Sequence, residues 1–120
     1  NIYGPSMDDV DAAIEKYASL VKHIHITELD IRANEEMGGQ LQFSRKGVEI
    51  KPYIQTLHAN QYSQLFKTLR KHKDVVDVVT FWNLSDRDSW VGTSNYPLLF
   101  DKEYRPKPTF FSVRDLGRSR

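Results

Sequence analysis

Two amphipathic stretches and two short apolar runs alternate along the chain. After Ser6, apolar residues recur at helical spacing, and Ser6 with Asp9 three positions later resembles a capping box. This pattern predicts a helix over about 7–22. A second helical pattern ends in the basic residues of 67–73, which suit the dipole at a helix carboxyl terminus. Its apolar positions are Ala59, Tyr62, Leu65, Phe66 and Leu69.

Each of these helical patterns is followed by a run typical of a buried strand. Residues 23–30 and 75–82 are rich in β-branched side chains and almost free of turn residues, so we expect two strands that are buried on both faces. Strand periodicity of two predicts that one face of the first strand carries Ile24, Ile26, Glu28 and Asp30.

The remaining segments predict loops and one short helix. Residues 31–51 contain three glycines without a sustained period, which indicates a long loop with one short hairpin at most, and 83–96 form a polar loop. Pro106 and Pro108 open a last helix that Gly117 could end. Helices alternating with strands indicate a parallel α/β fold. Two strands cannot close a sheet, so we expect part of a larger fold.

Composition narrows the function classes. The 120 residues are 39% hydrophobic and 28% charged, as in one soluble globular domain. A net charge of +1 argues against a nucleic-acid partner, and no apolar run reaches the roughly 18 to 20 residues of a membrane span. The absence of cysteine excludes disulfides, thiol nucleophiles and cysteine zinc sites.

Glu28 is the first candidate for chemistry, because it stands at the carboxyl end of a predicted strand, where parallel α/β folds place reactive groups. A buried carboxylate without a purpose would be costly. The alternative, equally weighted from spacing, is that Glu28 and Asp30 lie in water beyond the strand or pair with a neighbouring Arg or Lys.

Two tryptophans are candidates for sugar binding. Trp82 occupies the corresponding place on the second predicted strand, and Trp90 lies in the loop that follows. An aromatic ring can pack against the C–H face of a pyranose while the sugar hydroxyls form hydrogen bonds at the rim. Packing in the core or in the loop would explain both tryptophans as well.

The sequence gives little indication of a metal-binding or nucleotide-binding site. His23 and His25 could share a strand face, but no third ligand follows at a suitable spacing, which favours a structural role. The acidic run 86–88 lacks the glycine and the bidentate glutamate of a calcium loop, where Val91 and Pro97 stand instead. The chain contains no GxxxxGK[ST], GxGxxG or GxSxG motif.

Three ordered blocks together resemble glycoside hydrolase family 10, the endo-1,4-β-xylanases. The sequence HITELDI at 25–31 resembles the nucleophile strand of that family. The block VTFW to DRDSW at 79–90 and the block PLLFD to PKP at 97–108 agree with the family in order and spacing.

The resemblance implies an α/β fold, the carboxyl-terminal third of a TIM (β/α)8 barrel that runs from helix six through strands seven and eight to helix eight. Residues 1–120 would then be a partial catalytic domain. Glu28 would be the nucleophile, and Asp30 would support the hydrogen-bond network behind it. Trp82 and Trp90 would be aromatic walls of the subsite beside the scissile bond, with no metal and no cofactor.

The resemblance also implies what this chain lacks. Retaining glycosidases need a second carboxyl group about 5 to 5.5 Å from the nucleophile, and in the family that acid/base lies on strand four, while a histidine on strand six faces the nucleophile. We therefore expect the chain alone to be inactive, and to bind the missing amino-terminal part of the barrel or to self-associate. Xylan or a xylo-oligosaccharide would be the substrate, in a secreted or periplasmic setting.

Two features depart from the family pattern and leave cleft shape open. Asn83 stands where glycine is common, and the loop after Asp30 is long. A non-catalytic fragment that binds xylan through its tryptophans, and a structural α/β module without a sugar function, remain as alternatives.

Overall fold

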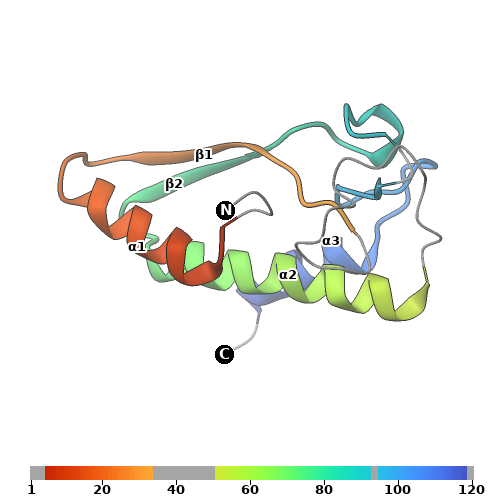
Figure 1. The fold of residues 1–120 in the computed structure, drawn as a ribbon, viewed down its shortest axis with the longest axis horizontal. Coiled ribbons are helices and arrows are strands. Elements are labelled where there is room, and N and C mark those ends of the chain that lie inside the picture. The colour runs from red at the N-terminus through yellow and green to blue at the C-terminus, as the bar shows by residue number, and fades with distance from the viewer. Residues whose placement is uncertain (1–4, 34–50, 93–94, 119–120) are drawn as a thin grey trace.

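The computed structural model describes residues 5–33, 51–92 and 95–118 (Figure 1). In this part of the chain the sheet has two strands, which are parallel and adjacent. The elements in chain order are α1 (Met7–Ala18), β1 (Ile24–Leu29), α2 (Pro52–Lys71), β2 (Val76–Phe81), the turn η2 (Asp86–Asp88), α3 (Pro108–Arg114) and the turn η4 (Asp115–Gly117). The predicted alternation of helices and strands is confirmed.

The first helix begins as the sequence predicts and ends earlier. Ser6 Oγ accepts the Asp9 N–H at 3.1 Å, and Asp9 Oδ2 accepts the Ser6 N–H at 3.1 Å, which completes the capping box. The amide of Leu20 turns back to the carbonyl of Tyr17 at 2.8 Å, so the chain leaves the helix before the predicted end at 22. Leu20 is 74% exposed and gives no packing energy that would extend the helix.

The second helix follows its predicted apolar pattern. It starts at Pro52, and Tyr62, Leu65 and Leu69 are buried as expected. The basic residues at its end do more than complement the dipole. Lys71 Nζ lies 2.6 Å from Asp11 Oδ2, and His72 contacts the other oxygen of the same carboxylate, which ties α2 to α1.

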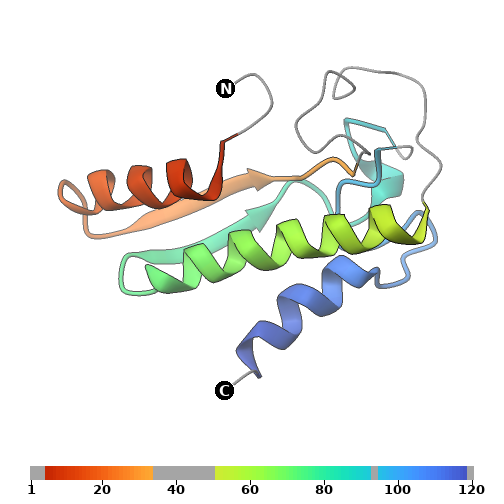
Figure 2. The ribbon, with the colours of Figure 1, turned by 60° about the horizontal axis from the view of Figure 1, so that its bottom comes forward.

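Helices cover one face of the sheet (Figures 1 and 2), and α2 lies between α1 and α3 in Figure 2. A core of Ile14, Leu65 and Leu69 packs beneath the strands. The prediction of strands buried on both faces is wrong for the described residues, because no helix covers the other face. Val78 on β2, for example, is 42% exposed.

A local irregularity changes the face that Glu28 occupies. Ile24 and Ile26 pack against the core, and so do Leu29 and Ile31, so the alternation shifts by one position between the two pairs. The strand register is irregular at the same place, and Glu28 has a φ of 57°, in the left-handed region. The prediction that Glu28 and Asp30 share a face with Ile24 is therefore wrong. Glu28 itself is exposed.

The segments after the strands pair with each other. The Ile31 N–H donates to the Pro97 carbonyl at 3.3 Å, and the Ala33 N–H donates to the Asn95 carbonyl at 2.8 Å. The last helix begins at Pro108 and is followed by a turn ending at Gly117, as predicted. The predicted long loop lies mostly outside the described residues. Among the helices that the structure describes, none has the length and hydrophobicity needed to span a membrane.

Candidate functional site

The carboxyl ends of β1 and β2 lie side by side. Leu29 is paired with Phe81, and the Trp82 N–H donates to the Leu29 carbonyl at 2.9 Å. Because the strands are parallel, the residues that follow them lie at the same edge of the sheet. This edge carries Glu28, Asp30 and Trp82, and the loop after β2 adds Trp90.

Asp30 and Trp90 are in direct contact. The indole Nε1–H of Trp90 donates to Asp30 Oδ2 at 2.8 Å. The guanidinium carbon of Arg32 lies 5.7 Å from the centroid of the Trp90 ring, within the range of a cation–π contact. Trp90 is nevertheless 68% exposed. Arg32 was not predicted as a site residue, although its position two residues after Asp30 was a usable signal.

Glu28 stands at this edge in a conformation that costs free energy. A non-glycine residue in the left-handed region is strained by roughly 1 to 2 kcal/mol. Within the described residues, no group donates a hydrogen bond to the Glu28 carboxylate, and no Arg or Lys forms an ion pair with it. The pairing alternative raised by the sequence therefore finds no support in this part of the chain. A strained, exposed carboxylate suits a chemical role.

Trp82 is held by an unusual backbone. It is 44% exposed, and the following residue, Asn83, has a φ of 100°. Glycine adopts this φ without strain, whereas an asparagine here is strained. The Asn83 side chain compensates by donating from Nδ2 to the Asp88 carbonyl at 2.8 Å, so it orders the loop that leads to Trp90.

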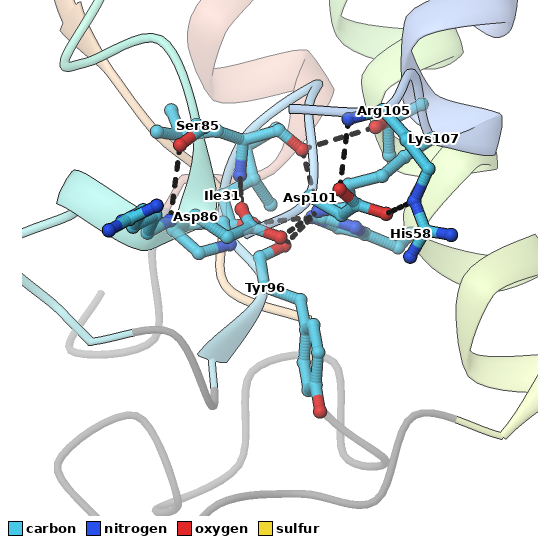
Figure 3. A network of polar contacts seen from close by, with 12 residues as sticks. Ile31, His58, Ser85, Asp86, Tyr96, Asp101, Arg105 and Lys107 are labelled. Atoms are coloured by element: carbon cyan, nitrogen blue, oxygen red, sulfur yellow. Dashed lines mark hydrogen bonds and ion pairs between the residues drawn. The ribbon is translucent and has the colours of Figure 1, made fainter. Parts of the chain in front are cut away.

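A buried ion pair fixes the loops behind this edge (Figure 3). Lys107 Nζ donates to Asp86 Oδ2 at 2.8 Å, to the Tyr96 carbonyl at 2.8 Å and to the Leu98 carbonyl at 2.7 Å. Asp86 Oδ1 accepts the Leu98 N–H at 2.8 Å. Burial raises the pKa of the Asp86 carboxyl and lowers the pKa of the Lys107 ammonium. The Asp86 carboxylate is thus bound on both oxygens, by Lys107 and by the Leu98 N–H.

Two side chains of α2 form hydrogen bonds to the segments that follow the strands. The buried His58 donates from Nε2 to the Ile31 carbonyl, and Tyr62 donates its hydroxyl to the Pro97 carbonyl. Burial, together with the nearby charge of Lys107, lowers the pKa of His58 to about 4, so the imidazole is neutral near pH 7. His58 was not predicted as a site residue, although a histidine four residues before Tyr62 on an apolar helix face was a signal.

Other clusters of ligand-type residues lie elsewhere. His23 Nδ1 lies 2.6 Å from Asp77 Oδ2 near the amino-terminal ends of the strands, a contact that fits its predicted structural role. Asp11, Glu15 and His72 offer three ligand atoms within 4.8 Å of one another. Asp11 already binds two basic side chains that join α1 to α2, so an interhelical ion-pair cluster accounts for its geometry.

Comparison with known proteins agrees with this geometry. The model of glycosyl hydrolase family 10 matches residues 1–116. An endo-1,4-β-xylanase/feruloyl esterase of Xylanibacter ruminicola is 52% identical over 116 residues, which are 96% of this chain and 16% of that protein. A thermostable celloxylanase of Thermoclostridium stercorarium is 38% identical, over 100% of this chain and 31% of its own length.

Solved structures give the same result. A psychrophilic family 10 endo-β-1,4-xylanase is 57% identical with a TM-score of 0.78, over 95% of this chain and 33% of that one. Xylanase XynB of Paenibacillus barcinonensis, in complex with a conduramine derivative, is 32% identical with a TM-score of 0.76, over 94% of this chain and 35% of that one. This chain therefore spans about a third of these solved structures.

Proposed function

This chain belongs to glycosyl hydrolase family 10, and from that membership we propose that it is part of a retaining endo-1,4-β-xylanase. It supplies the nucleophile, Glu28, and the acid/base carboxyl comes from the rest of the barrel. The observation that carries the proposal is the strained, exposed Glu28 at the same sheet edge as two exposed tryptophans.

The fold assignment follows the order of the elements. Family 10 xylanases are TIM barrels, and we place this chain in the carboxyl-terminal third. Helix α1 is helix six, β1 and β2 are strands seven and eight, and α2 and α3 are helices seven and eight. Parallel neighbouring strands with α2 between α1 and α3 support this placement. The active-site face of such a barrel is the edge where Glu28 lies.

The proposed reaction is a double displacement. The Glu28 carboxylate attacks the anomeric carbon of a xylose unit, the glycosidic C–O bond breaks, and the acid/base carboxylic acid protonates the leaving oxygen. The resulting ester joins Glu28 to the sugar. The acid/base carboxylate then takes a proton from water, and the water oxygen attacks the anomeric carbon and breaks its ester bond to Glu28. The released sugar keeps the anomeric configuration of the substrate. The chain alone, without the acid/base, completes no cycle.

The tryptophans are proposed to bind the sugar. Trp82 and Trp90 are both exposed, and in the proposed enzyme they stack against the C–H faces of xylose units. Xylan and xylo-oligosaccharides are the substrates that the relatives suggest, since one similar structure is a mutant in complex with xylotriose. Secretion or export to the periplasm, where xylan is met, is part of the same proposal.

The test uses a chimeric barrel in which this chain replaces the aligned third of the psychrophilic endo-xylanase. Glu28→Ala should lower kcat on an aryl xylobioside by about four orders of magnitude, the scale for loss of a nucleophile. Azide fits the space left by the carboxylate and should restore turnover, giving the α-xylobiosyl azide. The matched control, Glu15→Ala on α1, should leave kcat unchanged. An active Glu28→Ala barrel, or rescue that yields a β-azide, would contradict the proposal.

A further inference from the structure

Trp90 is an exposed loop side chain whose indole is nevertheless tied to one segment of the chain. Its Nε1–H reaches Asp30 Oδ2 at 2.8 Å, a charge-assisted hydrogen bond across 60 positions of sequence. With 68% of the residue exposed, packing alone does not fix the ring. The hydrogen bond to Asp30 is therefore the contact that defines its edge.

Arg32 acts on the face of the same ring. Its guanidinium carbon lies 5.7 Å from the ring centroid. Asp30 and Arg32 are two positions apart in the sequence, and both contact the Trp90 side chain. One segment therefore contacts both the edge and one face of the indole.

The segment that carries these two residues is itself fixed. Ile31, between them, donates its N–H to the Pro97 carbonyl and accepts the Nε2–H of His58. Ala33 is fully buried and donates to the Asn95 carbonyl at 2.8 Å. Asp30 and Arg32 thus project from a backbone bonded on both sides, directly after Glu28.

We propose that Asp30 and Arg32 are positioning residues that hold the Trp90 indole as a sugar platform in register with Glu28. The inference rests on the proposed function, since it specifies how the site orients its substrate. The same short segment then determines both the place of attack and the plane on which the sugar lies. Neither residue touches the reacting atoms in this role.

The first test is a double-mutant cycle between Asp30→Ala and Trp90→Phe in the chimeric barrel. Asp30→Ala removes the acceptor, and Trp90→Phe removes the donor while keeping an aromatic ring. Asp30→Ala should lower kcat/KM on xylotriose by about tenfold, the scale of one hydrogen bond to a charged group. In the Trp90→Phe background the same substitution should cost less than about twofold. Asp30→Asn, which keeps an acceptor oxygen, should recover most of the loss.

A full tenfold loss from Asp30→Ala in the Trp90→Phe background would overturn the proposal, because Asp30 would then act on another group. Arg32→Met should raise KM about two- to fivefold with kcat unchanged, as expected for a weaker platform. Arg32→Lys should recover part of that change. An unchanged KM in Arg32→Met would remove Arg32 from the assignment.

A spectroscopic measurement separates this proposal from the proposed function. In barrels with ¹⁵N-labelled indoles, the signal lost in Trp90→Phe belongs to Trp90. Asp30→Ala should move that signal and speed its hydrogen exchange, whereas Glu15→Ala should leave it in place. If the barrel lacks xylanase activity but the signal depends on Asp30, the function fails and the positioning role stands. If the barrel is active but Asp30→Ala leaves the Trp90 signal unchanged, the positioning role is wrong and the proposed function still stands.

Discussion

Replacing Lys107 by Met tests whether the buried ion pair holds the loops of the site. Met keeps most of the apolar stem and removes the ammonium. The Lys107 side chain is 10% exposed and that of Asp86 is 1% exposed. The substitution leaves the Asp86 carboxylate without its cation and the carbonyls of Tyr96 and Leu98 without the donor that joins them.

The expected loss is large because the partner charge stays buried. Removing one member of a buried ion pair costs about 3 to 5 kcal/mol. At about 2 °C per kcal/mol for a protein of barrel size, the Tm of the chimeric barrel should fall by about 6 to 10 °C. Burial already raises the pKa of Asp86, and loss of Lys107 raises it further. The decrease in Tm caused by Lys107→Met should therefore be smaller at about pH 5 than at about pH 8, because at the lower pH the unpaired Asp86 carboxylate can take up a proton.

Differential scanning calorimetry of three variants measures this effect. Asp86→Asn combined with Lys107→Met should recover part of the loss, because Asn is neutral and still offers an oxygen to the Leu98 N–H. The control is Arg105→Met, which breaks the ion pairs of a 71% exposed arginine with Asp101 and Glu103 and should cost less than about 1 kcal/mol. A Tm change for Lys107→Met as small as that of Arg105→Met would refute the reasoning.

Three further predictions follow from individual residues. Because Glu28 has a φ of 57°, Glu28→Gly should stabilise the barrel by about 1 kcal/mol relative to Glu28→Ala, while both abolish turnover; equal Tm values for the two variants would contradict the strained backbone. The pKa of His58 is lowered to about 4, so the unfolded state binds a proton first as the pH falls, and stability should drop by about 3 kcal/mol between about pH 6.5 and 4. When the free energy of unfolding is measured with urea at each pH, the His58→Gln barrel should lack this decrease. The same decrease in both proteins would show that His58 does not titrate as described. Trp82→Ala and Trp90→Ala should each weaken kcat/KM on xylo-oligosaccharides by roughly 1 to 3 kcal/mol; folded variants with unchanged kcat/KM would make the tryptophans packing residues.

The helices and strands were predictable because their signals are local. The capping box at Ser6, the apolar stripe of α2 and Pro108 each act within a few positions of sequence, and all three are observed. The residues at the strand ends were predictable for a similar reason, because parallel strands bring their carboxyl ends together.

The remaining features depend on contacts that periodicity does not encode. The shift coincides with the left-handed residue Glu28, and it reverses the faces that a strict period of two assigns to the positions after Ile26. Lys107 and Asp86 are 21 positions apart in the sequence, and Trp90 and Asp30 are 60 apart, so no local sequence pattern predicts either contact. The exposure of the second sheet face reflects helices that cover only one side of the described strands.

Covalent trapping tests the central claim that Glu28 is the nucleophile. A 2-deoxy-2-fluoro xylobioside with a good leaving group should form a stable ester in the chimeric barrel, because the fluorine slows both steps while the leaving group keeps the first one fast enough. Peptide mapping by mass spectrometry should place the added 2-fluoroxylobiosyl group on Glu28. A label on Asp30, Glu35 or Glu36, or hydrolysis with inverted anomeric configuration, would contradict the account.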